Sequence, residues 1–140
     1  MSIIEDVSGT HGKILIIDDE QDVRDVLKLQ LGEGGYNVIE AQDGEEGVNL
    51  MKKGSNLVEV GLIICDIRMP KVNGIEAIEY LKANCPSIPV MVVSGYPDTE
   101  LAVSLVKKGV KDYLVKPVAR EQLLKKVAEI LSAKQDFDYV

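Results

Sequence analysis

The sequence predicts an α/β fold: a doubly wound five-stranded parallel sheet, of strand order 2-1-3-4-5, in a single domain. Five short apolar runs recur along the 140 residues, and their starts lie 23 to 27 residues apart. This spacing fits one strand, one helix and two short loops per unit. The runs are uniformly apolar, as in a parallel sheet that helices cover on both faces. A five-strand chain of this length best suits the order 2-1-3-4-5.

The five predicted strands are rich in Val, Ile and Leu, which favour extended backbone. In chain order they are "KILII" from Lys13, "YNVIE" from Tyr36, "LIIC" from Leu62, "PVMVV" from Pro89 and "DYLV" from Asp112.

The segments between and after these strands have apolar residues at helical spacing. The stripes are, in order, 23/26/27/31, 47/50/51, 75/78/81, 102/105/106 and 123/124/127/130/131. Glycine or proline follows each of the first four and can end the helix. The order is therefore βαβαβαβαβα, with right-handed crossovers. We expect the domain to span residues 13–132, between an N-terminal extension at 1–12 and a C-terminal tail at 133–140.

Composition excludes several functional classes. The formal net charge is −7, which argues against direct nucleic-acid binding because phosphate backbones need clustered Lys and Arg. No apolar run approaches the roughly 20 residues that span a bilayer, and the N-terminus has no signal-peptide pattern. The two cysteines, Cys65 and Cys85, form no disulfide framework. A reduced, cytoplasmic protein that does not contact the membrane is the plain interpretation.

The polar residues that follow the strands carry the functional signal. Asp18 and Asp19 come directly after the first strand, Asp66 after the third, Ser94 after the fourth and Lys116 after the fifth. Ligands of such sheets bind outside the carboxyl ends of the strands, beside the switch point between strands 1 and 3. We therefore expect these five side chains at one edge of the sheet. Glu20 is more simply read as a first-turn helix residue.

The acidic cluster predicts a metal site. Neighbouring strands lie about 4.8 Å apart, so Asp66 faces the Asp18–Asp19 pair across one strand spacing. Carboxylates this close repel, and one of them tends to hold a proton unless a cation is present. Mg²⁺ suits such a site because it binds carboxylates, waters and phosphate oxygens. With Ser94 and Lys116 to stabilise charge, the set fits phosphoryl transfer to Asp66 as an aspartyl phosphate.

These residues closely resemble the receiver domain of two-component response regulators. The matching stretches are "ILIIDDE", "CDIRMPKVNG", "VVSGY" and "DYLVKP", in the same order and on the same strands. The resemblance covers essentially all of residues 12–132 and implies a flavodoxin-like (βα)5 fold. It also implies a signalling switch in a phosphorelay rather than a turnover enzyme.

Carried over residue by residue, the resemblance implies that Asp66 accepts a phosphoryl group from a sensor histidine kinase or phosphotransfer protein. Asp18, Asp19 and Asp66 would hold Mg²⁺ together with the backbone carbonyl of Arg68. Lys116 would pair with the phosphate, and its peptide bond to Pro117 is expected to be cis.

The resemblance also implies a switch. Ser94 would bind the phosphoryl oxygen after activation, and the aromatic Tyr113 would turn inward as Ser94 moves. The surface of the fourth predicted helix, the fifth strand and the fifth helix would then change for partners, and the chain could form a homodimer. The downstream effector stays unnamed. Arg68, Gly95 and Tyr96 would flank the phosphoryl group: Arg68 could pair with it, Tyr96 could shield it from water, and Gly95 leaves it approachable.

Three other functions stay open at this point. A Mg²⁺-dependent hydrolase with an Asp nucleophile fits less well, because such enzymes place the nucleophile after strand 1. A flavin-binding protein should have Ser, Thr and Gly after strand 1, where this chain has "DDEQD". A receiver that acts independently of phosphorylation would not need the full set of acids, serine and lysine.

Overall fold

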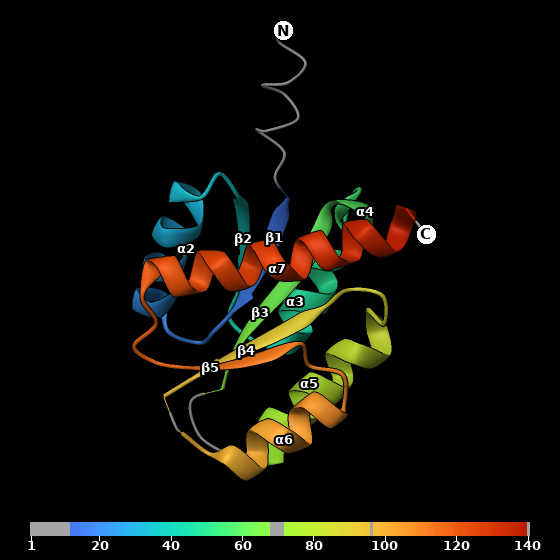
Figure 1. The fold of residues 1–140 in the computed structure, drawn as a ribbon. Coiled ribbons are helices and arrows are strands. Elements are labelled where there is room, and N and C mark those ends of the chain that lie inside the picture. Colours follow the sequence, from blue (N-terminus) through green and yellow to red (C-terminus); the bar gives the residue numbers. More distant parts are fainter. Residues whose placement is uncertain (1–11, 68–71, 96, 140) are drawn as a thin grey trace, which may run out of the picture.

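Five parallel strands form one sheet in the order β2-β1-β3-β4-β5, which confirms the predicted fold (Figure 1). The structure is a computed structural model, and it describes residues 12–67, 72–95 and 97–139. The strands are β1 (Lys13–Ile17), β2 (Asn37–Ala41), β3 (Val60–Ile67), β4 (Val90–Ser94) and β5 (Asp112–Val115). The strand order changes direction between β1 and β3, as required for a binding site at that point.

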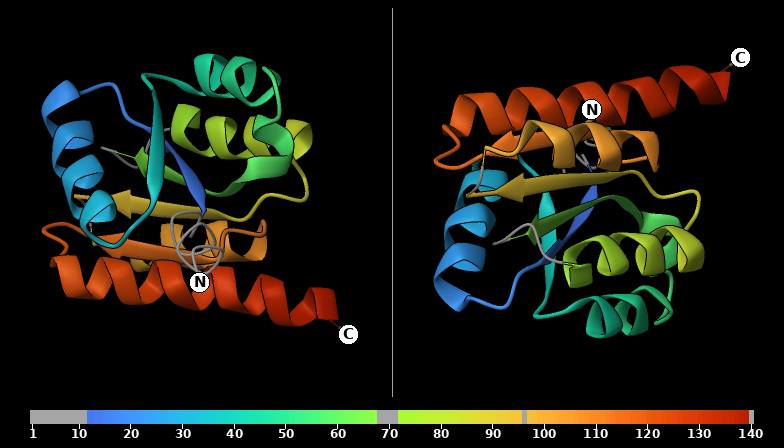
Figure 2. Two further views of the ribbon diagram at one scale, coloured as in Figure 1. Left: turned by 90° about the horizontal axis from the view of Figure 1, so that it is seen from above. Right: turned by 90° about the horizontal axis from the view of Figure 1, so that it is seen from below.

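Helices cover both faces of the sheet (Figure 2). The helices are α2 (Gln21–Glu33), α3 (Gly44–Met51), α4 (Asn56–Glu59), α5 (Val72–Asn84), α6 (Thr99–Lys107) and α7 (Arg120–Tyr139). On one face, α2 and α7 pack onto the sheet through residues such as Leu31 and Leu123. On the other face, α3, α5 and α6 pack through residues such as Met51, Leu81 and Leu105. The protein therefore has three layers and two apolar cores.

Alternation along each strand supplies both cores. In β1, Ile14 and Ile16 face α2 and α7, whereas Leu15 and Ile17 belong to the opposite cluster. This is the two-residue period of an extended chain. All five residues of β4 are buried, but β2 at the edge of the sheet is only half-buried. The sheet thus holds Asp18, Asp66 and Ser94 on or directly after its most buried strands, and Lys116 after the edge strand β5.

Strands β2 and β4 each begin and end one residue later than expected, and three other elements differ more. Strand β3 runs to Ile67, two residues beyond "LIIC", so Asp66 lies inside the strand and not after it. The short helix α4 has no predicted counterpart. Helix α7 continues to Tyr139, through the segment expected to be a tail, because Ala133, Lys134 and Gln135 favour helix and no Gly or Pro interrupts them. In the described ranges, no helix is both long and apolar enough to cross a bilayer.

Candidate functional site

Four strands deliver polar residues to one edge of the sheet. Asp18 follows β1, Asp66 is the second-last residue of β3, Ser94 ends β4 and Lys116 follows β5. The register pairs Ile17 with Cys65, so the next residues along, Asp18 and Asp66, lie level with each other. The predicted convergence of these residues is thus present in the fold.

Asp66 and Lys116 form an ion pair. The Lys116 ammonium donates a hydrogen bond to Oδ2 of Asp66, bridging 50 positions of sequence. The Asp66 side chain has an exposed fraction of 0%, against 28% for Lys116. The second oxygen of Asp66, Oδ1, is buried and accepts no hydrogen bond. A buried carboxylate oxygen without a donor is costly, which leaves Asp66 suited to a cationic or electrophilic ligand.

Asp18 lies beside Asp66 and is 2% exposed. Its Oδ1 accepts a hydrogen bond from the backbone N–H of Glu20 at 2.9 Å, but its Oδ2 is buried without a partner. Burial, contact with the Asp66 carboxyl group and the negative charge of Asp66 together raise the pKa of Asp18 to about 8, although the hydrogen bond from the Glu20 N–H lowers it. Asp18 therefore holds a proton near neutral pH, as expected for crowded carboxylates without a cation.

The rest of the predicted metal site is less complete. Asp19 is exposed and contacts Asp18, whose pKa it helps to raise. Within residues 12–67, 72–95 and 97–139, no three acidic, His or Cys side chains converge tightly enough to hold a metal ion. Arg68, whose carbonyl is the fourth predicted ligand, lies outside the described residues. The two orphaned oxygens, Asp18 Oδ2 and Asp66 Oδ1, nevertheless suit Mg²⁺, because hard dications bind carboxylate oxygen.

The predicted switch residues lie on neighbouring strands, Ser94 on β4 and Tyr113 on β5. Ser94 is 0% exposed, and its carbonyl accepts a hydrogen bond from the backbone N–H of Lys116 at 2.8 Å. Tyr113 is half-buried on β5 and packs against the core beneath α3, α5 and α6. The Lys116–Pro117 peptide bond is cis, in agreement with the expectation.

Of the three predicted phosphate-flanking residues, Gly95 alone is described. It is exposed directly after β4, and an added Cβ would meet no atom within 4 Å. Arg68 and Tyr96 lie outside the described residues.

Arg24 is a site-supporting residue that the sequence did not predict. From the second turn of α2, its Nη1 donates to the backbone carbonyl of Asp18. Its Nε forms an ion pair with Glu40 of β2 at 3.1 Å, and its side chain is 13% exposed. Arg24 thereby links the loop that carries Asp18 and Asp19 to the edge strand β2. Because this contact is to a backbone carbonyl, no side-chain pattern could reveal it.

Comparisons with known proteins agree on one family. Residues 14–128 match the response regulator receiver domain. A cyclic di-GMP phosphodiesterase of Thermotoga maritima is 38% identical over 118 residues, which are 84% of this chain and 30% of that protein. The transcriptional regulatory protein ZraR of Klebsiella oxytoca is 32% identical over 126 residues, which are 90% of this chain and 28% of that protein. The chain thus spans less than a third of these two relatives.

Solved structures resemble the whole fold. A response regulator receiver domain protein from Clostridium thermocellum has a TM-score of 0.79 at 28% identity, over 90% of this chain and 98% of that one. A CheY-like receiver domain protein from Methanospirillum hungatei has a TM-score of 0.77 at 30% identity, over 89% of this chain and 97% of that one.

Proposed function

Because the chain belongs to the response regulator receiver domain family of two-component signalling, we propose that Asp66 is its phosphoacceptor. The donor is a sensor histidine kinase or a phosphotransfer protein. The observation that carries this proposal is the buried Asp66 carboxylate, held by Lys116 on one oxygen and left without a donor on the other. The chain then acts as a switch that catalyses no turnover beyond its own phosphorylation and dephosphorylation.

The chemistry follows from the placement of charge. An oxygen of Asp66 attacks the phosphorus of the donor, a P–O bond to Asp66 forms, and the bond to the leaving group breaks. Lys116 balances negative charge on the phosphoryl oxygens, and the buried setting strengthens this interaction. Positioning and charge stabilisation supply most of the catalysis in such transfers.

Mg²⁺ is the proposed cofactor. Asp18, Asp19, Asp66 and the carbonyl of Arg68 would hold it, and the ion would neutralise the carboxylates and the incoming phosphoryl oxygens. Supporting this assignment, Asp18 and Asp66 each have a buried oxygen that accepts no hydrogen bond. Arg24 holds the Asp18 backbone in place from α2.

We propose that phosphorylation is read through Ser94 and Tyr113. The Ser94 hydroxyl binds the phosphoryl group, and Tyr113 turns inward on β5. The half-buried position of Tyr113 supports this, because the ring has both core and solvent within reach. The surface of α6, β5 and α7 then changes for an effector or for a second copy of the chain. The proposal places the protein in the cytoplasm, where free thiols such as those of Cys65 and Cys85 persist.

Phosphorylation with a small-molecule donor tests the assignment of Asp66. Incubation with Mg²⁺ and acetyl phosphate is expected to add one phosphate, measured by intact mass, and Asp66→Asn is expected to abolish the addition. The control variant Asp25→Asn removes an exposed carboxylate from α2 and should be phosphorylated normally. Phosphate found on a residue other than Asp66 would refute the assignment.

The proposed flanking residues control the lifetime of the phosphoryl group. If Arg68 pairs with the phosphate and Tyr96 shields it from water, Arg68→Ala and Tyr96→Ala should each change the dephosphorylation rate. The rate is measured as loss of the phosphorylated mass after removal of acetyl phosphate. Unchanged rates in both variants would contradict these two roles and would leave the assignment of Asp66 intact.

A further inference from the structure

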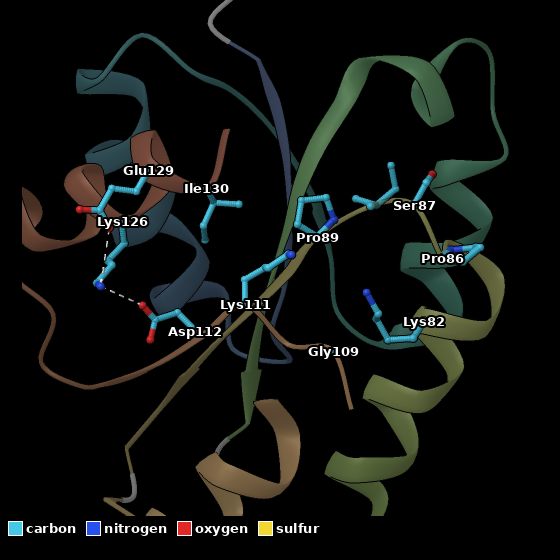
Figure 3. A pocket seen from close by; sticks show the side chains of 11 residues that line it. Lys82, Pro86, Ser87, Pro89, Gly109, Lys111, Asp112, Lys126, Glu129 and Ile130 are labelled. Carbon is cyan, nitrogen blue, oxygen red and sulfur yellow. Dashed lines mark ion pairs between the residues drawn. The ribbon is translucent and has the colours of Figure 1, made fainter. Parts of the chain in front are cut away.

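Figure 3 shows a pocket of about 800 Å³. It lies at the end of the sheet opposite to Asp66. Its walls are the last turns of α5, the turn before β4, the loop before β5 and the middle of α7. Because Pro89 and Lys111 directly precede β4 and β5, the pocket lies at the amino ends of these strands, whereas Ser94 and Lys116 lie at their carboxyl ends. It is therefore separate from the proposed phosphorylation site.

The acidic groups of the pocket are already paired. Three lysines and two carboxylates line it. Lys126 on α7 lies 3.1 Å from Oδ2 of Asp112 and 3.7 Å from Oε1 of Glu129. Figure 3 shows this ion-paired group together on one side of the pocket. Lys126 thus pairs with both carboxylates, and the other two lysines lie outside this ion-paired group. Three positive and two negative side chains leave the pocket with one net positive charge.

Those two lysines, Lys82 and Lys111, extend toward the same space beside Pro89 (Figure 3). Among the described residues, no acidic group forms an ion pair with either of them. Lys82 is half-buried and lies against Gly109: a Cβ added there would be 3.1 Å from Cε and 3.6 Å from Nζ of Lys82. Gly109 has a φ of +105°, which glycine adopts without strain, so the close approach is built into the turn.

The positive charges of Lys82 and Lys111 repel each other. The pKa of Lys82 is lowered, first by burial and then by the positive charge of Lys111. An anion between the two ammonium groups would relieve this repulsion. Lysine is a common phosphate ligand, since its compact charge and rotatable N–H donors fit a tetrahedral oxyanion.

We propose that this pocket binds a phosphate group between Lys82 and Lys111, as free phosphate or as part of a small phosphate monoester. The apolar side chains of Pro86, Pro89 and Ile130 line the remaining space and would contact the organic part of a monoester. Both sources present the same phosphate chemistry to the two lysines.

Titration followed by amide NMR tests the proposal on the full chain. The protein is titrated separately with inorganic phosphate and with phenyl phosphate. EDTA is present so that no metal ion binds at the proposed phosphorylation site. We expect chemical-shift changes at the amides of Ser87, Ile88 and residues 109–112 with both probes. In the Lys82→Ala/Lys111→Ala double variant, affinity should fall by about tenfold, which corresponds to about 1.4 kcal/mol. The control Lys125→Ala removes an exposed lysine of α7 outside the pocket and should bind like the parent protein.

Each outcome is decisive. Tighter binding of phenyl phosphate than of phosphate would identify a monoester as the ligand, and equal binding would identify free phosphate. Shifts confined to Asp18, Asp66 and Lys116, or equal affinity in the double variant and the parent, would overturn the proposal. Should the double variant lose its folded spectrum, Lys111→Ala alone, at an exposed position, provides the comparison. Failure here would leave phosphorylation of Asp66 unaffected, since that is measured separately with Mg²⁺ and acetyl phosphate.

Discussion

Asp18 is a buried carboxyl group whose charged form is disfavoured in the folded protein. It is buried beside Asp66, one of its oxygens lacks a donor, and its pKa is raised to about 8. In the unfolded chain the same group titrates near 3.8. Between these two values the folded state binds the proton that the unfolded state has lost, so unfolding releases a proton. The stabilising contribution of protonated Asp18 is complete below pH 4 and is lost as the pH rises toward 8.

We therefore expect the contribution of this residue to the free energy of unfolding to fall between about pH 4 and pH 8 in EDTA. Asp18→Asn should reduce this pH dependence and raise the melting temperature at pH 8, because the amide carries no charge. Thermal melts at several pH values measure the effect. Asp22→Asn, on the exposed side of α2, is the control and should keep the pH dependence of the parent. A pH profile unchanged in Asp18→Asn would contradict the assigned cause.

At this scale the sequence predicted the main contact and missed a supporting one. The position of Lys116 after β5 predicted that it would lie at the same end of the sheet as Asp66, and the two residues form an ion pair. The crowding of Asp18 and Asp66 followed from their strand ends. Arg24 could not be predicted, because its partner on the acidic loop is a backbone carbonyl.

At the scale of elements, Arg24 links three of them: the loop after β1, the edge strand β2 and helix α2. Its partner Glu40 also pairs with Lys28 at 3.3 Å, but the Lys28 side chain is 57% exposed against 13% for Arg24. The two basic residues thus offer a matched comparison on one carboxylate.

Arg24→Ala is expected to lower the free energy of unfolding by about 1–2 kcal/mol, because it removes the side-chain donor of the Asp18 carbonyl and the less exposed of the two ion pairs of Glu40. Lys28→Ala should cost less than about 0.5 kcal/mol, since exposed ion pairs contribute little. Urea denaturation measures both. Equal losses in the two variants would show that Arg24 does not brace the loop.

Helix α4 and the last turns of α7 were not predicted, because neither has an apolar stripe. Helix α4 buries none of its four residues, so the helical period has nothing to mark it. The second helical stripe, at 47/50/51, is weak because Gly47 packs directly on the sheet: an added Cβ would come within 2.8 Å of Ile17. The end of α7 was placed too early because the apolar stripe stops at Leu131 while the backbone remains helical.

At the scale of the whole molecule, burial decreases from the centre of the sheet to the β2 edge. β1, β3 and β4 lie inside the sheet, whereas β2 pairs with β1 alone and is half-buried. The strand order was predictable because uniformly apolar runs and regular spacing admit few topologies. The exact strand ends were not, because tertiary pairing extends β3 beyond its apolar run.

Hydrogen exchange should follow this gradient. Amides of β3 and β4 are expected to exchange slowest, by global unfolding, and those of β2 faster, by local opening at the edge. NMR or mass spectrometry after transfer to D₂O measures the rates. Protection in β2 equal to that in β4 would mean that the sheet opens as one unit.

The repulsion between Asp18 and Asp66 lowers the thermal stability of the protein, but the same two carboxylates are needed for the proposed phosphorylation. A library selected for thermal tolerance alone would enrich neutral side chains at position 18, since these remove the repulsion from Asp66. The selected variants would have a higher melting temperature, but they would lack one ligand of the proposed magnesium site. A selection for thermally stable variants of this protein must therefore also test each variant for phosphorylation.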